Sequence, residues 1–307
     1  MASASYSGYL ATGQQVGCGI LRRNGFGGQL RRFCILKLDQ ETDQMANPLT
    51  TFPVGQSHVS VYSSKSEMGA AAAADASQIL RDVISQRGHA RIIVATGNSQ
   101  LDVITSLTAD RSIRWSSVEL FHMDEYVGLP SSHSASFAGW VKNYVTDKVH
   151  LAKVHYLRGD AANLDEEADH YGKSLTSVPI DLCFLGFGEN GHIAFNDPHV
   201  ADFHDPLIIK RVTLDKKCRE QQVGEGHFPD IEAVPQEAIT LTCPTLMSAR
   251  QLICCVPESR KAEAVRNALE GPLTEACPAS LVVTHPGAKI YLDRNSAALL
   301  NTSPTLK

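Results

Sequence analysis

The sequence predicts an α/β protein built on a largely parallel sheet. From about residue 58 onward, short apolar runs alternate with segments of helical period, which is the pattern of consecutive βαβ units. A chain of 307 residues with 43% hydrophobic content can bury a core of that size. Because the sequence has no internal repeat and no low-complexity linker after residue 45, we expect a single domain over residues 45–307.

The first helix is expected to begin at the capping box Ser64–Glu67 and to stop at Gly88. A Ser followed three residues later by Glu satisfies the free amides at a helix start, and Gly readily adopts the left-handed conformation that ends a helix. The apolar run Arg91–Ala95 then predicts a buried strand. Six further strands are expected, mostly separated by helices, at Val118–His122, Val154–Leu157, Ile180–Leu185, Ala238–Thr242, Gln251–Val256 and Lys289–Leu292.

Residues 1–44 differ from the rest of the chain. Gly, Ser and Gln dominate this segment, and no acidic residue precedes Asp39. We interpret it as a leader that is disordered. Its early arginines are also a feature of organelle transit peptides, but a true start at Met45 is the simpler interpretation.

Charge and hydropathy exclude several classes of partner. The formal net charge of −5 and the pI near 6.2 provide no basic field for nucleic acid. No stretch approaches the roughly 20 apolar residues that cross a bilayer, so no membrane span is expected. The eight cysteines are scattered and form no CxxC pair, which favours buried thiols in a reducing, cytoplasmic setting over disulfides.

The twelve histidines do not predict a metal site. The sequence has no HExxH motif, and the cluster of His199, Asp202, His204 and Asp205 matches no known ligand spacing. We therefore expect neither a metal nor an organic cofactor.

Ligands of open α/β sheets bind at the carboxyl ends of the strands, so the residues after each apolar run are the informative ones. The first such loop is Thr96, Gly97, Asn98 and Ser99, directly after the strand Ile92–Ala95. Gly97 permits a tight turn, and the free amides with the Ser99 hydroxyl would form a cradle for an anion. An ordinary turn contains the same residue types for conformational reasons, so both interpretations stay open at this point.

The second loop, Met123–Pro130, begins with two adjacent carboxylates. Side chains alternate along an extended chain, so Asp124 and Glu125 point in different directions and cannot both face one substrate. We expect one to do chemistry and the other to brace the loop. A solvated acidic turn is the alternative.

The third loop, Gly186–Pro198, combines three glycines with a histidine. The glycines let the backbone come close to a ligand, and His192 carries protons near neutral pH. Asn190 and Asp197 lie within a few residues and could set the tautomer and orientation of the imidazole. A lone His in such a loop is usually structural, but three polar loops at strand ends of one sheet favour a site.

Together these segments resemble the glucosamine-6-phosphate deaminase family, which belongs with 6-phosphogluconolactonases in one larger group. The motifs MDEYVGLP at Met123–Pro130 and GHIAFN at Gly191–Asn196 are the most specific, and similarity continues through Val256–Lys261. The resemblance covers about residues 60–295. It implies a Rossmann-like three-layer α/β/α sandwich that binds no nucleotide and uses no cofactor.

The resemblance also implies residue roles. The loop from Thr96 to Ser99 would hold the phosphate of a small-molecule sugar phosphate, and Lys261 would add a positive charge to it. Asp124 would be the central base, and His192 would assist opening of the sugar ring. The family reaction moves a proton between the second and first carbons and expels ammonia, leaving fructose 6-phosphate.

The sequence departs from the family pattern at three places. Asn190 stands where deaminases typically have Asp, and Asp197 where they have Glu. Asn cannot ionise but can hydrogen-bond the imidazole, so Asp197 is expected to supply the negative charge. A family arginine that grips the phosphate aligns near Gln222, and Arg219, about one helical turn away, is expected to replace it.

Three alternatives remain beside a glucosamine-6-phosphate deaminase. A 6-phosphogluconolactonase usually carries GHTAS after an Asp, which Ile193–Asn196 do not match. A galactosamine-6-phosphate deaminase would fit an altered set of carboxylates. A noncatalytic sugar-phosphate sensor is kept open by Asn190. Residues 199–235, rich in charge and His, are read as a mobile cover. Because relatives range from monomers to hexamers, a homo-oligomer is allowed but not predicted.

Overall fold

The computed structural model describes residues 8–9, 15–16 and 47–301. Most of the predicted leader therefore lies outside the described residues. Within it, strand β1 (Gly8–Tyr9) pairs antiparallel with β2 (Gln15–Val16). Residues 45–307 form a compact unit of their own.

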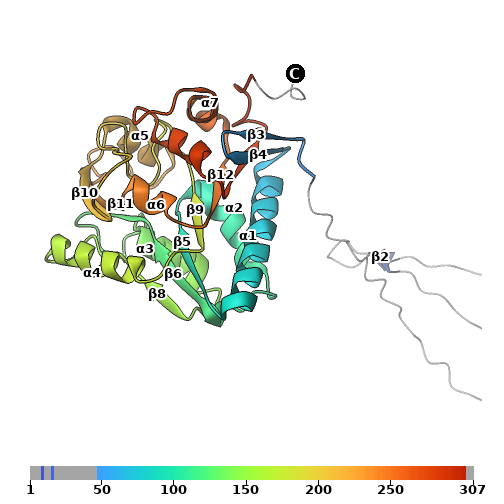
Figure 1. The fold of residues 1–307 in the computed structure, drawn as a ribbon, viewed down its shortest axis with the longest axis horizontal. Helices are drawn as coiled ribbons and strands as arrows, with labels where there is room; N and C mark the ends of the chain where they lie inside the picture. Colours follow the sequence, from blue (N-terminus) through green and yellow to red (C-terminus); the bar gives the residue numbers. More distant parts are fainter. Residues whose placement is uncertain (1–7, 10–14, 17–46, 302–307) are drawn as a thin grey trace, which may run out of the picture. The chain divides into compact units, whose positions relative to one another are not determined.

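The centre of this unit is a sheet of eight strands in the order β3-β4-β13-β12-β9-β5-β6-β8 (Figure 1). All neighbouring strands run parallel except β3 and β4, which form an antiparallel pair. The predicted α/β class with a mostly parallel sheet is confirmed. In chain order the strands are β3 (Thr50–Val54), β4 (Ser57–Tyr62), β5 (Ala90–Val94), β6 (Val118–His122), β8 (Lys153–His155), β9 (Leu182–Leu185), β12 (Gln251–Val256) and β13 (Ala288–Asp293).

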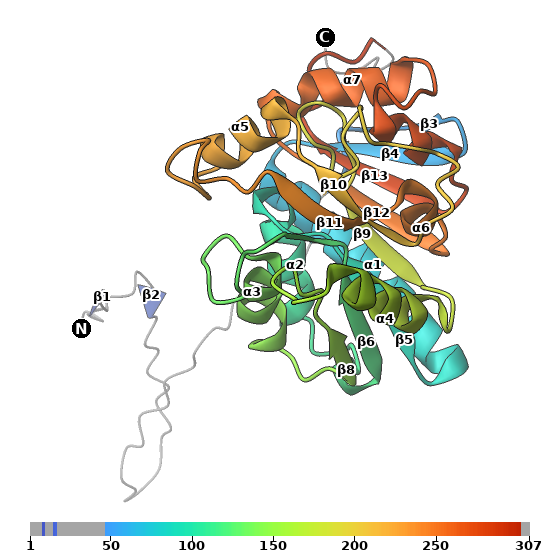
Figure 2. The ribbon, with the colours of Figure 1, turned by 90° about the vertical axis from the view of Figure 1, so that its left-hand side faces the viewer.

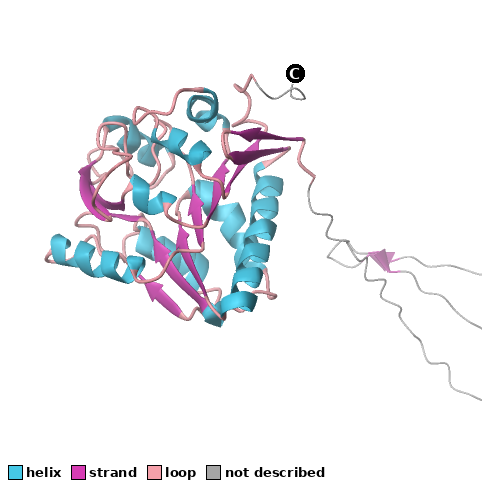
Figure 3. Cartoon of the chain, viewed as in Figure 1, coloured by secondary structure: helices cyan, strands magenta, loops and turns pink. Residues whose placement is uncertain are grey.

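Helices cover both faces of this sheet, which gives the three-layer sandwich (Figure 3). Alternate residues of one strand enter two different cores: Ile92 joins one apolar cluster and Ile93 the other. One core is closed by α1 (Lys65–Arg87), α2 (Leu101–Ala109) and α3 (Phe137–Val141). The other is closed by α4 (Leu164–Thr176), α6 (Cys243–Met247) and α7 (Ala262–Glu270).

The predicted ends of the first helix are confirmed by its caps. The Ser64 side chain accepts a hydrogen bond from the Glu67 amide, and Gly88 takes the left-handed conformation with φ 81°. Its N–H donates to the Ile84 carbonyl at 2.8 Å. Local capping chemistry therefore fixed both boundaries.

The strand predicted at Ala238–Thr242 is present as β11 (Glu237–Leu241), but it lies outside the parallel sheet. It is the middle strand of an antiparallel sheet with the order β10-β11-β7. Its neighbours β10 (Ile209–Thr213) and β7 (Asp124–Tyr126), like the β3–β4 hairpin, were not predicted. Strands β10 and β7 acquire their form from pairing with β11, which is distant in the chain, and local periodicity does not reveal such pairing.

A third apolar cluster supports α5 (Lys216–Gly224) and the chain after it, beside the small sheet (Figure 2). The cluster joins Tyr126 of β7, Val212 of β10 and Cys218 of α5 with Phe195 and Phe228. It holds the segment 199–235 against the strand that carries Asp124. The segment read as a cover therefore contains a strand and a helix packed on a core.

The described residues include no helix that is long and apolar enough to cross a membrane. Six cysteines lie in the described part of the chain, and all six are free and buried. The prediction that cysteines serve as small buried side chains is confirmed for these six.

Candidate active site

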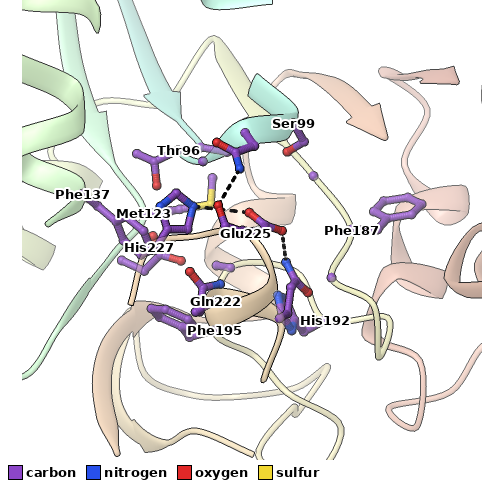
Figure 4. Close-up of a pocket in the computed structure, with 18 of the residues that line it drawn as sticks. Thr96, Ser99, Met123, Phe137, Phe187, His192, Phe195, Gln222, Glu225 and His227 are labelled. Carbon is purple, nitrogen blue, oxygen red and sulfur yellow. Dashed lines mark hydrogen bonds and ion pairs between the residues drawn. The ribbon is translucent and has the colours of Figure 1, made fainter. Parts of the chain in front are cut away.

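Four adjacent strands of the parallel sheet end at one pocket. In the order β12-β9-β5-β6 their carboxyl ends lie at the same edge of the sheet. Strand β5 is the point where the strand order changes direction, because β6 follows it on one side and β9, later in the chain, lies on the other. Figure 4 shows side chains from these loops facing a common space. Seven of the residues that line this pocket were proposed for the site from the sequence: Thr96, Gly97, Asn98, Ser99, Asp124, His192 and Lys261. The pocket thus gathers residues from all three predicted loops and adds the loop after β12.

The carboxyl group of Asp124 is buried and free of protein partners. Asp124 is 6% exposed, and no described residue donates a hydrogen bond to its side chain. Burial, and then the neighbouring Glu125 charge, raise the pKa of Asp124 well above its usual value. A carboxylate with a raised pKa is a stronger base than an ordinary Asp side chain.

The backbone of Asp124 is held by a buried imidazole. The Leu157 amide donates to His122 Nε2 at 2.8 Å, so the ring proton sits on Nδ1, which donates to the Asp124 carbonyl at 3.0 Å. Burial lowers the pKa of His122 to about 4, so the ring stays neutral. His122 therefore positions the strand end that carries Asp124.

Glu125 points away from the pocket and braces the next segment. Its carboxylate accepts hydrogen bonds from the Ser136 hydroxyl at 2.7 Å and from the amides of Tyr126, Phe137 and Ala138 at 2.9, 3.2 and 2.9 Å. The two adjacent carboxylates thus have different surroundings, as the alternation of an extended chain requires.

The imidazole of His192 lies against the carboxylate of Asp197, which is in turn hydrogen-bonded to the side-chain amide of Asn190. Its Nδ1 lies 2.9 Å from Asp197 Oδ1, although the ring N–H is not aligned for a hydrogen bond. Asn190 Nδ2 donates to that oxygen at 2.9 Å and to Asp215 at 2.7 Å. Burial alone would raise the pKa of Asp197, but its contacts with His192 and Asn190 outweigh burial and lower it. Asp197 is therefore ionised, and neither Asn190 nor Asp197 lines the pocket.

Close backbone packing fixes where the imidazole can lie. A Cβ atom on Gly188 would stand 2.3 Å from the His192 ring, so any other residue there would displace the ring. Within GHIAFN, Ala194 adopts φ 50°, a conformation that non-glycine residues rarely take. The buried Asn196 side chain donates to the Ile193 carbonyl at 3.0 Å and locks this turn.

The opposite end of the pocket has the features of an anion site. Gly97, at φ 92°, starts a short 3-10 turn, Asn98–Gln100, that leads into α2. Lys261 lies at 3% exposure beside this loop, and burial lowers the pKa of its ammonium group. Amides at a helix entry and a buried ammonium group suit a phosphate.

A carboxylate of the chain itself already stands at that end. Glu225 Oε1 lies 3.0 Å from Arg260 and 3.8 Å from Lys261, and it accepts a hydrogen bond from Gln221 at 2.8 Å. Figure 4 shows Glu225 in the pocket next to His227, whose Nε2 is 3.4 Å from the second carboxylate oxygen. Although burial opposes it, these groups lower the pKa of Glu225 to about 2.

Sequence reasoning did not identify Glu225. The available signal was the acid between two glycines, Gly224 and Gly226, inside the segment read as a cover. Gln222 does line the pocket at the position of the family arginine.

The structure does not bring Arg219 to the pocket. Its guanidinium donates to the backbone carbonyls of Ile231 and, at 3.1 Å, Val234. It is absent from the pocket lining and serves to tie α5 to the loop that follows. Residues three apart on a helix are neighbours, so the spacing from Gln222 allowed Arg219 to replace the family arginine. Its contacts with these two carbonyls, which the sequence does not reveal, hold its side chain outside the pocket instead.

Two groups of described residues have metal-ligand atoms within 4.8 Å of one another: His192, Asp197 and Cys218, and Asp197, His199 and Asp215. Their carboxylates already accept hydrogen bonds, Asp197 from Asn190 and Asp215 from the Cys218 amide. Burial raises the pKa of the Cys218 thiol well above its usual value, so it stays protonated. The hydrogen bonds of the two carboxylates therefore account for the close approach of these side chains.

In the sequence cluster of His199, Asp202, His204 and Asp205, for which no metal site was expected, both carboxylates also have partners within the chain. Asp205 pairs with Lys210 at 2.8 Å, and Asp202 accepts a hydrogen bond from the His204 amide at 2.7 Å.

Comparison with known proteins identifies relatives of this arrangement. A family model described as glucosamine-6-phosphate isomerases/6-phosphogluconolactonase matches residues 63–291. A glucosamine-6-phosphate deaminase of Bacillus cytotoxicus is 32% identical over 222 residues, which cover 72% of this chain and 82% of that protein. One of Exiguobacterium sibiricum is 34% identical over 208 residues, covering 68% of this chain and 80% of that protein.

Solved structures agree with these relatives. A monomeric glucosamine-6-phosphate deaminase superposes with a TM-score of 0.71 at 27% identity and covers 79% of this chain and 99% of its own. A 6-phosphogluconolactonase from Trypanosoma brucei superposes with a TM-score of 0.66 at 18% identity, covering 82% of this chain and 100% of its own. The second likeness shows a shared fold.

Proposed function

The chain belongs to the family of glucosamine-6-phosphate isomerases and 6-phosphogluconolactonases, and from this premise we propose that it is a glucosamine-6-phosphate deaminase. It would convert glucosamine 6-phosphate and water to fructose 6-phosphate and ammonia. The substrate would be a free small molecule, and six buried free cysteines favour a reducing compartment such as the cytoplasm.

One observation carries this proposal. The pocket combines a buried carboxyl without protein partners at Asp124, an imidazole backed by an ionised acid at His192, and a buried ammonium group at Lys261. A phosphosugar isomerisation needs a base at carbon, a proton donor at a sugar oxygen and a grip on the phosphate. These three side chains supply the three functions.

In the proposed reaction His192 first moves the proton of the C1 hydroxyl to the ring oxygen, so that the bond between C1 and the ring oxygen breaks and the pyranose opens to the aldehyde. Asp124 then removes the proton from C2 and returns it to C1. In the same shift a proton passes from the C2 amine to the C1 oxygen, so the aldehyde becomes a hydroxymethyl group and the amine becomes an imine. Water then hydrolyses the imine to the ketone with release of ammonia. The raised pKa of Asp124 suits a base that must hold the proton between the two carbons.

The remaining residues support these groups. Asp197 stabilises the imidazolium form of His192, and Asn190 fixes Asp197 through a hydrogen bond at 2.9 Å. Thr96, Gly97, Asn98 and Ser99 form the phosphate loop next to Lys261. Arg219, which lies outside the pocket, has no role in this proposal.

Hydrolysis of 6-phosphogluconolactone is the alternative within the family. A lactonase needs one base to activate water, and His192 could be that base. In a lactonase mechanism of this kind the buried carboxyl of Asp124 in the pocket would have no catalytic role. The deaminase uses both groups, and for that reason we favour it. Galactosamine 6-phosphate differs from the proposed substrate in the configuration of one hydroxyl group, and its deamination would follow the same reaction.

The test incubates the purified full chain with glucosamine 6-phosphate and follows ammonia and fructose 6-phosphate separately. Equal amounts of both products are expected. Parallel reactions contain galactosamine 6-phosphate and 6-phosphogluconolactone. Turnover of the lactone alone would replace the proposal with the lactonase, and binding without turnover of any of the three would replace it with a sensor.

A further inference from the structure

The ammonium group at the anion end of the pocket is already paired with a carboxylate of the chain itself. Arg260 lies within 4 Å of Glu258, Glu189 and Glu225, so it is shared among three carboxylates. Lys261 forms one ion pair within the described residues, and its partner is Glu225. Glu258 has a second cationic partner in Lys65 at 2.9 Å. Of these charged groups only Lys261 and Glu225 line the pocket, so one cation and one anion face each other where the substrate's phosphate would bind.

Glu225 sits where the chain has room to move it. It is the C-cap residue that directly follows α5 and lies between Gly224 and Gly226. Neither glycine has a neighbouring atom within 4 Å of the point where a Cβ would stand, and Gly226 has φ 80°. Glycine populates such conformations at no steric cost, so a turn of this segment has to break only the three backbone hydrogen bonds that the amides of residues 225–227 donate to the end of the helix.

The same segment also contacts the phosphate loop. Asn98 Nδ2 donates to the Glu225 backbone carbonyl at 3.3 Å. The backbone of Glu225 and the amide side chain of Asn98 are thereby bonded to each other, and this bond would have to be released for Asn98 to turn to a ligand.

A phosphate dianion and the Glu225 carboxylate cannot both occupy the vicinity of Lys261 at low cost, because like charges in a poorly solvated pocket repel strongly. We propose that Glu225 competes with the phosphate of the substrate for Lys261 and thereby sets the affinity of the pocket for phosphorylated ligands. Binding of a sugar phosphate displaces the carboxylate by rotation at Gly224 and Gly226. This inference rests on the proposed function for the nature of the ligand.

The test measures binding of inorganic phosphate to the full chain by isothermal titration calorimetry. Glu225→Gln keeps the shape of the side chain but removes its charge, and we expect it to bind phosphate at least tenfold more tightly than the unaltered protein. The matched control is Glu220→Gln on the same helix, since Glu220 pairs only with the exposed Lys216 in the described part of the chain. This control should bind phosphate as the unaltered protein does.

Two further variants complete the design. Lys261→Met should remove the gain when combined with Glu225→Gln, because the gain depends on a freed ammonium group. Glu225→Asp keeps the charge on a side chain one methylene shorter and should give an intermediate affinity. It replaces Glu225→Gln if circular dichroism shows that the latter is not folded.

Unchanged or weaker phosphate binding by folded Glu225→Gln would overturn the proposal and leave Glu225 as an anchor of α5. In that case its melting temperature should also fall. The phosphate titration involves no turnover, so it is independent of the assay for ammonia release. Tighter phosphate binding by Glu225→Gln, with no ammonia released by the unaltered protein, would support the competition and reject the deaminase. Ammonia release by the unaltered protein, with no gain in phosphate binding by Glu225→Gln, would support the deaminase and reject the competition.

Discussion

The backbone N–H of Phe195 donates to the hydroxyl of Thr240 at 3.1 Å, and Thr240 is the strand partner of Asp124. Strand β11 therefore connects the strand that carries the candidate base with the turn that carries the candidate imidazole. The distance between Asp124 and His192 is set by this antiparallel sheet as well as by the parallel one. A change in β11 would alter catalysis without touching the substrate.

Asp124→Asn is expected to reduce turnover by about 10³-fold or more, because Asn cannot carry a proton between carbons. The same variant should be more stable at neutral pH. The folded pKa of Asp124 is raised above 3.8, so the folded state loses stability as pH rises from there through the folded pKa. Removing that penalty should raise the melting temperature at pH 7.5 by about 2 °C or more. Scanning calorimetry at pH 4 and pH 7.5 checks this, and a lower melting temperature at pH 7.5 would contradict it.

Glu125→Gln is the matched contrast at the neighbouring position. Its carboxylate accepts hydrogen bonds from one hydroxyl and three amides, and a Gln side chain offers only one accepting oxygen. We expect a loss of about 1–3 kcal/mol in the free energy of unfolding. Urea unfolding measures it, and a variant as stable as the unaltered protein would show that the brace is unimportant.

Gly188→Ala tests whether the backbone fixes the imidazole. The added methyl group would stand 2.3 Å from the His192 ring and must displace it. Turnover should fall by about 10²-fold, the loss that follows from misplacing a catalytic group by about 1 Å. Gly172→Ala in α4 is the control, since its Cβ would meet Ile208 at an ordinary 3.5 Å. Equal activity of the two variants would argue against this role of Gly188.

Asp197→Asn removes the charge behind His192. Turnover should fall by about 10²-fold or more, because the imidazolium loses its partner. The folded pKa of Asp197 lies below 3.8, so its contribution to stability is present above pH 3.8 and is lost as pH falls through the folded value. The variant should therefore melt below the unaltered protein at pH 7 and approach it in strong acid. A difference in melting temperature that does not change with pH would reject the charge effect.

His192→Gln should affect the closed sugar more than the open one. We expect kcat/KM for glucosamine 6-phosphate to fall by about 10²-fold or more, and a smaller loss for its 5-deoxy analogue, which cannot form the pyranose ring. Steady-state assays on both substrates supply the comparison. Equal losses would remove the ring-opening role from His192.

Variants of Arg219 and Lys261 should show that the first residue contributes to the stability of the fold and the second to substrate binding. Arg219→Met leaves two backbone carbonyls, those of Ile231 and Val234, without this donor, so it should cost about 1–3 kcal/mol in the free energy of unfolding. Its KM should stay near that of the unaltered protein. Lys261→Met should raise KM by about tenfold or more through the lost contact to phosphate. A raised KM in the Arg219 variant would return that residue to the site.

Much of the candidate site could be predicted because its residues follow strands directly. The anion loop from Thr96 to Ser99, the acid Asp124 and the imidazole His192 each come just after an apolar run. Parallel strands bring such positions to one edge whatever the rest of the chain does. Glu225 could not be found in this way, because it lies at the end of a helix far from any strand of the parallel sheet and reaches Lys261 only through tertiary packing.

The sequence by itself determined the α/β class, the caps of α1 and most parallel strands, since period, capping and turn chemistry act over a few residues. The tertiary structure decided that β11 leaves the main sheet, that Arg219 turns from the pocket and that Glu225 enters it. These outcomes depend on pairing and charge contacts between residues far apart in the chain. Their free energies exist only once the fold has brought the partners together.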